Sequence, residues 1–318
     1  MLTLFRLTWR MHRTELVLLL SAAGVLALAT LWVGLQMSAT RSAELACIHE
    51  ANRLAGQMSP LRCEEYQSTV ETLMAAGGSL SLGASAAPFV LGLVLGVPLI
   101  GGELEGRTAS IAWTLSQSRR RWLLRRLVPV VVIAGVTALA IGLAGDVLAR
   151  AYPAFDGADP GFSGYGTRGP LLAIRGVAVL LMGVAVGALI GRILPAILVA
   201  AALCLVVFIG LFIVSDQWLR AEAVPLELGP AQTGASQVYD MGYRDDATGE
   251  IVSFENYYQV HSDGPMAGAE VPGMTMVAYS VPGSRYMDFV LRESGVLGGL
   301  ALLAGGLTLL VVTRRRPY

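Results

Sequence analysis

The sequence predicts an all-α polytopic membrane protein with six transmembrane helices. Its 318 residues are 54% apolar and 14% charged, whereas a soluble domain carries about 25% charged residues. The apolar residues also gather in runs of about 20, the length that crosses a hydrocarbon core of about 30 Å. This composition excludes a disordered chain and a nucleic-acid-binding domain. The runs cover residues 16–37, 80–100, 127–148, 171–190, 193–214 and 295–313.

The distribution of charge predicts the orientation of the six spans. If the N-terminus is cytoplasmic, the inner segments carry 13 of the 23 Arg residues but only three of the 23 acidic residues, Glu15, Glu103 and Glu105. Cytoplasmic loops of membrane proteins carry such an excess of positive charge. We therefore predict a multi-pass protein of the cell membrane with both termini in the cytoplasm.

Four parts follow from this layout. Residues 1–14, with Phe5 and Trp9 among three Arg, suit an amphipathic helix in the inner membrane interface. Residues 15–214 hold spans one to five, with an outer helical loop at 38–79 and an inner loop at 101–126. Residues 215–293 form a small outer subdomain of mixed structure, and residues 294–318 form the last span and a basic cytoplasmic tail.

The outer loop 38–79 reads as two short helices with a break near Ser59-Pro60. It contains Cys47 and Cys63, which this topology exposes to an oxidising exterior where cysteines pair. Either a disulfide bond or two free thiols is compatible with the sequence.

The outer segment 215–293 is acidic, with 12 acidic residues against four Arg. Residues 237–244 and 250–260 read as the arms of a β-hairpin around a Gly-containing turn at 245–249. Residues 283–292 read as a short amphipathic helix that leads into the last span.

Several kinds of chemistry are excluded or unsupported. The chain contains no Lys, so it has neither the P-loop Lys that reaches nucleotide phosphates nor a Schiff-base Lys. Its three His fall on both sides of the membrane in this topology, and His and Cys are too scattered for an evident metal site. We therefore expect no catalytic residue, no metal and no cofactor in this chain.

Charged residues are rare within the spans. Asp146 and Arg150 lie near the outer end of the third span and Arg175 near that of the fourth, and we expect Asp146 to pair with one of these two Arg. A buried acid or His relay of the kind found in ion-coupled transporters is missing. This favours a pathway for an apolar or amphipathic substrate.

Glycines recur at helical spacing on two spans. Gly183, Gly187 and Gly191 form one ridge on the fourth span, and Gly92 and Gly96 form another on the second. Small residues at this spacing let two helices approach closely. We expect packing within the chain rather than a dimer seam.

The inner loop holds the most specific pattern. Glu103, Glu105, Gly106 and Thr108 follow the second span, and Ser116 and Arg119 precede the third. The positive-inside rule explains the Arg residues of this loop, but acidic residues at an inner membrane end oppose that signal.

This pattern resembles the permease subunit of a type-2 ABC exporter, in particular actinobacterial members, with one departure in Arg107 between Gly106 and Thr108. The resemblance implies that a cytoplasmic ATPase subunit, in two copies, binds ATP and Mg and docks on the inner loop. It also implies a second permease copy, hence a dimer in membrane lipid, and efflux of a drug, antibiotic or lipid-like substrate. The residues that it assigns to ATPase coupling are Glu103, Glu105, Gly106, Arg107, Thr108, Ser116 and Arg119.

Two other classes of function remain open. A non-transporting membrane anchor or assembly protein would present residues 215–293 to a partner and would have no ATPase subunit. A membrane enzyme acting on lipid would need acids or His clustered at one interface, which the sequence does not contain.

Overall fold

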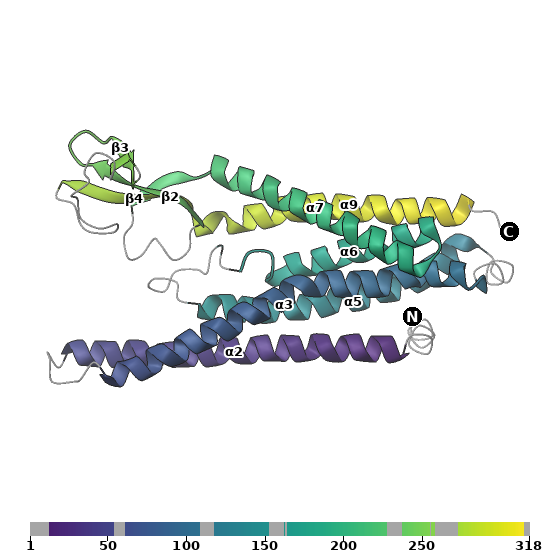
Figure 1. Cartoon of the computed structure of the whole chain (residues 1–318), viewed down its shortest axis with the longest axis horizontal. Coiled ribbons are helices and arrows are strands. Elements are labelled where there is room, and N and C mark those ends of the chain that lie inside the picture. The colour runs from purple at the N-terminus through teal and green to yellow at the C-terminus, as the bar shows by residue number, and fades with distance from the viewer. Residues whose placement is uncertain are drawn as a thin grey trace. The chain divides into compact units, whose positions relative to one another are not determined.

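The computed structural model is mostly helical and contains six helices long and apolar enough to cross a membrane (Figure 1). It describes residues 13–53, 61–108, 118–152, 162, 164–227, 237–254, 256–257 and 273–314. The interfacial helix predicted over residues 1–14 lies almost wholly outside these ranges. The six helices are α2 (Arg13–Arg53), α3 (Leu61–Glu105), α5 (Arg119–Ala151), α6 (Gly169–Ile190), α7 (Ile193–Ala221) and α9 (Tyr286–Arg314).

The chain divides into two compact units, one of residues 1–151, 164–209 and 291–318, the other of residues 152–163 and 210–290. The first unit holds the apolar core. Leu16, Ile100, Leu123, Leu180 and Val312 are all buried in one of its clusters, so five helices contribute to it. Leu16 lies in the first turn of α2 and Val312 in the last turn of α9, so the described ends of the chain lie at the same end of this unit (Figure 1).

Helices α2 and α3 are longer than the spans predicted for them. They have 41 and 45 residues, and 41 residues at about 1.5 Å each give roughly 60 Å, about twice the hydrocarbon core. The two short helices expected within 38–79 are therefore extensions of the first two spans. Their Thr hydroxyls donate to carbonyls one turn back, as Thr40 does to Gln36, so these polar residues continue the helix. The break expected near Ser59-Pro60 lies outside the described residues.

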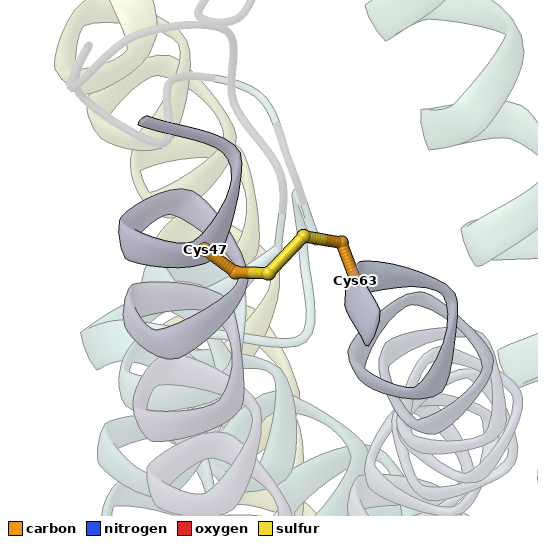
Figure 2. The surroundings of a disulfide bond; sticks show 2 residues. All are labelled: Cys47 and Cys63. Atoms are coloured by element: carbon orange, nitrogen blue, oxygen red, sulfur yellow. A yellow bond between two sulfur atoms is a disulfide. The ribbon is translucent and has the colours of Figure 1, made fainter. Parts of the chain in front are cut away.

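These extensions are cross-linked to each other. The structure joins Cys47 of α2 and Cys63 of α3 in a disulfide bond, with Cα atoms 6.0 Å apart (Figure 2). A disulfide bond that closes a loop of this size lowers the entropy of the unfolded chain, which stabilises the folded state by about 3 kcal/mol. The formation of this disulfide bond in the cell stays a prediction.

The glycine ridges bring α3 and α6 into backbone contact. A Cβ on Gly96 would lie 2.5 Å from the Leu180 carbonyl oxygen, and a Cβ on Gly187 would lie 2.6 Å from the Val97 carbonyl oxygen. Both distances are too short for real atoms, so only glycine allows this approach. The expectation of packing within the chain is confirmed, except that Gly191 instead ends α6 in a left-handed conformation, with φ 70°.

The second unit contains a four-stranded antiparallel sheet of order β1-β4-β2-β3. The hairpin predicted from residue 237 is present, but its second arm ends at Ser253 instead of residue 260. The Asp245 carboxylate closes the turn by accepting N–H bonds from Ala247 and Thr248, which lower its pKa. The strands are β1 (Val224–Glu227), β2 (Gln237–Asp245), β3 (Ile251–Ser253) and β4 (Met274–Val281).

The last span is one continuous helix with the segment before it. A single 3₁₀ turn, η3 (Gly283–Arg285), leads directly into α9. The short amphipathic helix expected over 283–292 is therefore present as this 3₁₀ turn and the first turns of α9, and it is not an element distinct from the last span. No Pro or Gly interrupts residues 286–294, so the helix has no reason to stop there.

The close contact of α3 and α6 predicts how single glycines respond to Ala. Gly96→Ala should lower the free energy of unfolding by about 1–3 kcal/mol, because the added methyl meets the Leu180 carbonyl. Gly305→Ala is the matched control, since nothing lies within 4 Å of a Cβ there and Ala favours a helix over Gly. Thermal unfolding of the purified variants in detergent measures both. Equal melting temperatures for the two variants would contradict the contact.

Candidate functional site

The acidic motif forms the end of α3. After Glu105 the chain turns, and the Gly106 N–H donates to the Gly102 carbonyl at 2.9 Å. The Thr108 hydroxyl donates to the Glu103 carbonyl at 3.3 Å. Arg107 has a φ of 54°, in the left-handed region that usually requires glycine. Gly106, Arg107 and Thr108 therefore cap the helix, and Arg107 takes the position at which a glycine would cost no strain.

Glu103 forms an ion pair with Arg126 of α5. The side chains are only 12% and 21% exposed, so the pair is largely out of water. The Arg126 guanidinium also lies over the Trp122 ring, 4.8 Å from its centroid. Breaking a buried pair by removing one partner is costly, because the other charge is left unpaired. This pair holds the end of α3 against the beginning of α5.

Glu105 reaches another helix. Its Oε2 accepts the backbone N–H of Ile193 at 2.8 Å. Ile193 is the first residue of α7, where backbone N–H groups lack intrahelical partners and the helix dipole favours a negative charge. The carboxylate of Glu105 therefore caps α7 from the end of α3.

Arg119 contacts the last span. One of its guanidinium nitrogens donates to the Thr313 carbonyl of α9 at 3.2 Å, and a cation is favourable at the C-terminal end of a helix. The helix-end cluster, as we call it, thus joins α3, α5, α7 and α9. It consists of the side chains of Glu103, Glu105, Arg119 and Arg126 and the backbone of Ile193 and Thr313.

The structure describes all but one of the sequence-predicted site residues. Glu103, Glu105 and Arg119 belong to the helix-end cluster, and Gly106, Arg107 and Thr108 form the adjoining cap. Ser116 lies outside the described residues. Cys47 and Cys63 lie on the far extensions of α2 and α3, well removed in sequence from this motif.

The sequence reasoning missed a second polar cluster, at the beginning of α6. Glu293 of α9 is buried, with its side chain 2% exposed. Its carboxylate accepts hydrogen bonds from the Arg175 Nε at 2.7 Å and from the Tyr165 hydroxyl at 2.9 Å. Arg175 also donates to the Gly166 carbonyl at 2.9 Å. Glu293 therefore ties α9 to α6 and to the turn before it.

The prediction that Asp146 pairs with Arg150 or Arg175 was wrong. Asp146 pairs with Arg168 at 3.2 Å, at the residue that precedes α6, instead of with Arg150 or Arg175. Arg168 is itself 6% exposed, so this pair anchors the turn to α5. Arg175 is already neutralised by Glu293. A carboxylate directly before an apolar run, as at Glu293, is the signal that would have pointed to this second cluster.

Both clusters hold helices together. Their ion pairs and hydrogen bonds join neighbouring helices, although Glu103 Oε2 is buried without a hydrogen-bond partner among the described residues. Within the described ranges, no three His, Cys, Asp or Glu side chains gather in a way that would hold a metal ion.

The chain matches a known family across its first five spans. Residues 18–220 fit the family described as "ABC-2 membrane transporter related", which is more than half of the chain. No curated protein and no solved structure matches it. The matched range contains the acidic motif and its contacts to α5 and α7, and it ends before the sheet.

The buried pair of Arg175 and Glu293 predicts a strong dependence of stability on each charge. Glu293→Gln should lower the free energy of unfolding by about 3–5 kcal/mol, because Arg175 is left buried without a counter-charge. The double variant Arg175→Gln, Glu293→Gln should lose less than the sum of the two single variants. Glu50→Gln is the matched control, since its partner Arg53 is 74% exposed and such surface pairs contribute about 0–1 kcal/mol. Chemical unfolding in detergent measures all four. Additive losses would show that the two side chains do not interact.

Proposed function

The chain belongs to the ABC-2 membrane transporter related family, and from that membership we propose that it is the permease subunit of an ATP-driven exporter. Membrane subunits of this family generally contain no catalytic site and generally work with an ATPase partner. The proposed partner is a separate cytoplasmic ABC ATPase, in two copies, that binds ATP and Mg. Two copies of the permease, in the cell membrane, complete the transporter.

The helix-end cluster is the observation that carries this proposal. Residues 106–118 connect α3 to α5, and the residues on both sides of this connection are bound to other helices: Glu105 to α7 and Arg119 to α9. A force applied to the connection is therefore passed to four spans at once. This supports the inner loop as the element that receives the ATPase and converts its closure into a rigid-body movement of the spans.

The charge at this end supports its cytoplasmic location. Arg120, Arg125, Arg192 and Arg314 are exposed there, whereas Glu103 and Glu105 are engaged by α5 and α7. The surface of this end is therefore strongly basic, as the positive-inside rule requires of the cytoplasmic side. With both ends of the chain on this side, the sheet between α7 and α9 falls outside the cell.

An apolar or amphipathic substrate, such as a drug, an antibiotic or a lipid-like molecule, suits this chain best. Two acidic residues of the spans are paired with Arg, Asp146 of α5 with Arg168 and Glu293 of α9 with Arg175. Paired charges offer little attraction to a soluble ion. In this proposal export proceeds from the cytoplasm or inner leaflet to the outside.

Purification from the native membrane tests the partnership. We expect a P-loop ATPase to co-purify with this chain in equal amount, and ATP hydrolysis to disappear when the P-loop Lys of that partner is replaced. The same tagged preparation after mild detergent treatment serves as the control for loose association. Purification without any ATPase would favour the anchor or assembly function and would direct attention to what residues 215–293 bind.

Replacing Glu105 tests coupling. Because the Glu105 carboxylate is bound to the Ile193 N–H, Glu105→Ala should leave ATPase docking intact but remove the cap of α7, worth about 1 kcal/mol, and loosen the link of α7 to α3. We expect the permease to stimulate ATP hydrolysis several-fold less than the wild type does. Glu65→Ala, an exposed position near the start of the same helix, is the matched control. Stimulation equal to that of the wild type would contradict the coupling role, even if the ATPase co-purifies.

A further inference from the structure

An apolar groove of about 180 Å³ lies between α2 and α3. Small side chains create it, with Ala22 and Ala23 of α2 opposite Gly83 and Ala87 of α3, and Leu26 and Leu91 complete much of its wall. Its volume is below the roughly 300–1,000 Å³ of pockets that hold drug-sized ligands. A space of this volume between two apolar helices suits a single hydrocarbon chain.

The groove is open along one side. Ala22, Ala86 and Val90 at its margins are exposed, whereas Ala23 and Leu91 are buried. Because α2 and α3 both belong to the spans, the hydrocarbon of the bilayer is the medium that meets these exposed margins. A lipid chain therefore has direct lateral access to the groove.

One end of the groove approaches the level of the basic helix ends. Leu19, which lines the groove, also packs against the cluster that contains Leu16, Trp122 and Leu123. Arg120 and Arg125 lie two residues before Trp122 and two residues after Leu123, and both are exposed. In the part of the chain that the structure describes, neither guanidinium pairs with an acidic side chain. The groove therefore lies at the level of the acyl chains of an anionic lipid, and these two charges lie at the level of its headgroup.

We propose that this groove binds one acyl chain of an anionic phospholipid whose headgroup pairs with Arg120 and Arg125. The apolar walls provide the burial of methylene groups, and the two guanidinium groups provide the preference for a negative headgroup. This binding does not depend on export or on an ATPase, so it holds or fails separately from the proposed function.

Native mass spectrometry of the purified full chain tests the proposal. The probes are phosphatidylglycerol and phosphatidylcholine with identical acyl chains, and glycerol phosphate as a headgroup without chains. We expect one phosphatidylglycerol to be retained about 30-fold more strongly than phosphatidylcholine, the effect of two Arg near a membrane surface. Equal retention of the two lipids, binding of glycerol phosphate alone, or a lipid-free dimer in place of the complex would overturn it.

Variants separate the two parts of the site. Ala86→Phe and Ala22→Phe fill the groove from opposite walls and should each remove the retained lipid. Ala202→Phe, at an exposed position of α7 that does not line the groove, is the matched control and should retain it. Arg120→Gln with Arg125→Gln should keep lipid binding but abolish the preference for phosphatidylglycerol. Unchanged retention in both groove-filling variants, or an unchanged preference in the Arg double variant, would refute the site.

Discussion

The backbone contact between α3 and α6 is the constraint on which the rest of the membrane unit depends. Four glycines allow it, because any side chain at Gly96 or Gly187 would strike a carbonyl of the other helix. In lipid, where apolar side chains gain little by leaving one apolar medium for another, such close packing is a main source of helix association. The contact makes α6 the most buried of the six candidate spans. It also fixes the end of α3, and with it the acidic motif, relative to the turn where α6 gives way to α7.

Charged residues then fix the ends of the helices. Near the end of α6, Glu103 and Glu105 bind α5 and α7. Near its beginning, Glu293 binds Arg175 and Tyr165, and Asp146 binds Arg168. The pairs of Glu103 with Arg126 and of Glu293 with Arg175 are largely buried, so each charge is favourable only with its partner in place. A movement of the spans in a transport cycle must therefore keep these pairs or exchange them, which makes the helices move as bodies and not bend individually.

The sequence predicted the number and positions of the spans well, but it predicted the lengths of their helices poorly. Hydropathy marks where a helix is apolar, but a helix does not end where the bilayer ends. The extensions of α2 and α3 and the first turns of α9 are polar enough to look like separate elements, yet their backbone continues without a break. Strands β1 and β4 were missed because a strand of four to eight residues has no strong pattern of its own. Residues that pair in β1–β4 and β2–β4 lie 29 to 56 residues apart in the chain.

By itself, the sequence determined the number of spans, the glycine ridges, the absence of a Lys-dependent site and the motif that resembles type-2 ABC permeases. These features depend on composition and on spacing within one helix. Only the tertiary structure decided which charge meets which, for Ile193 lies 88 residues from Glu105 and Glu293 lies 118 residues from Arg175. Sequence periodicity predicts which face of a helix carries a carboxylate. It does not predict the partner of that carboxylate, because the partner depends on how closely the helices pack. Asp146 pairs with Arg168 for the same reason: Arg175, one of the two partners expected from depth alone, is already held by Glu293.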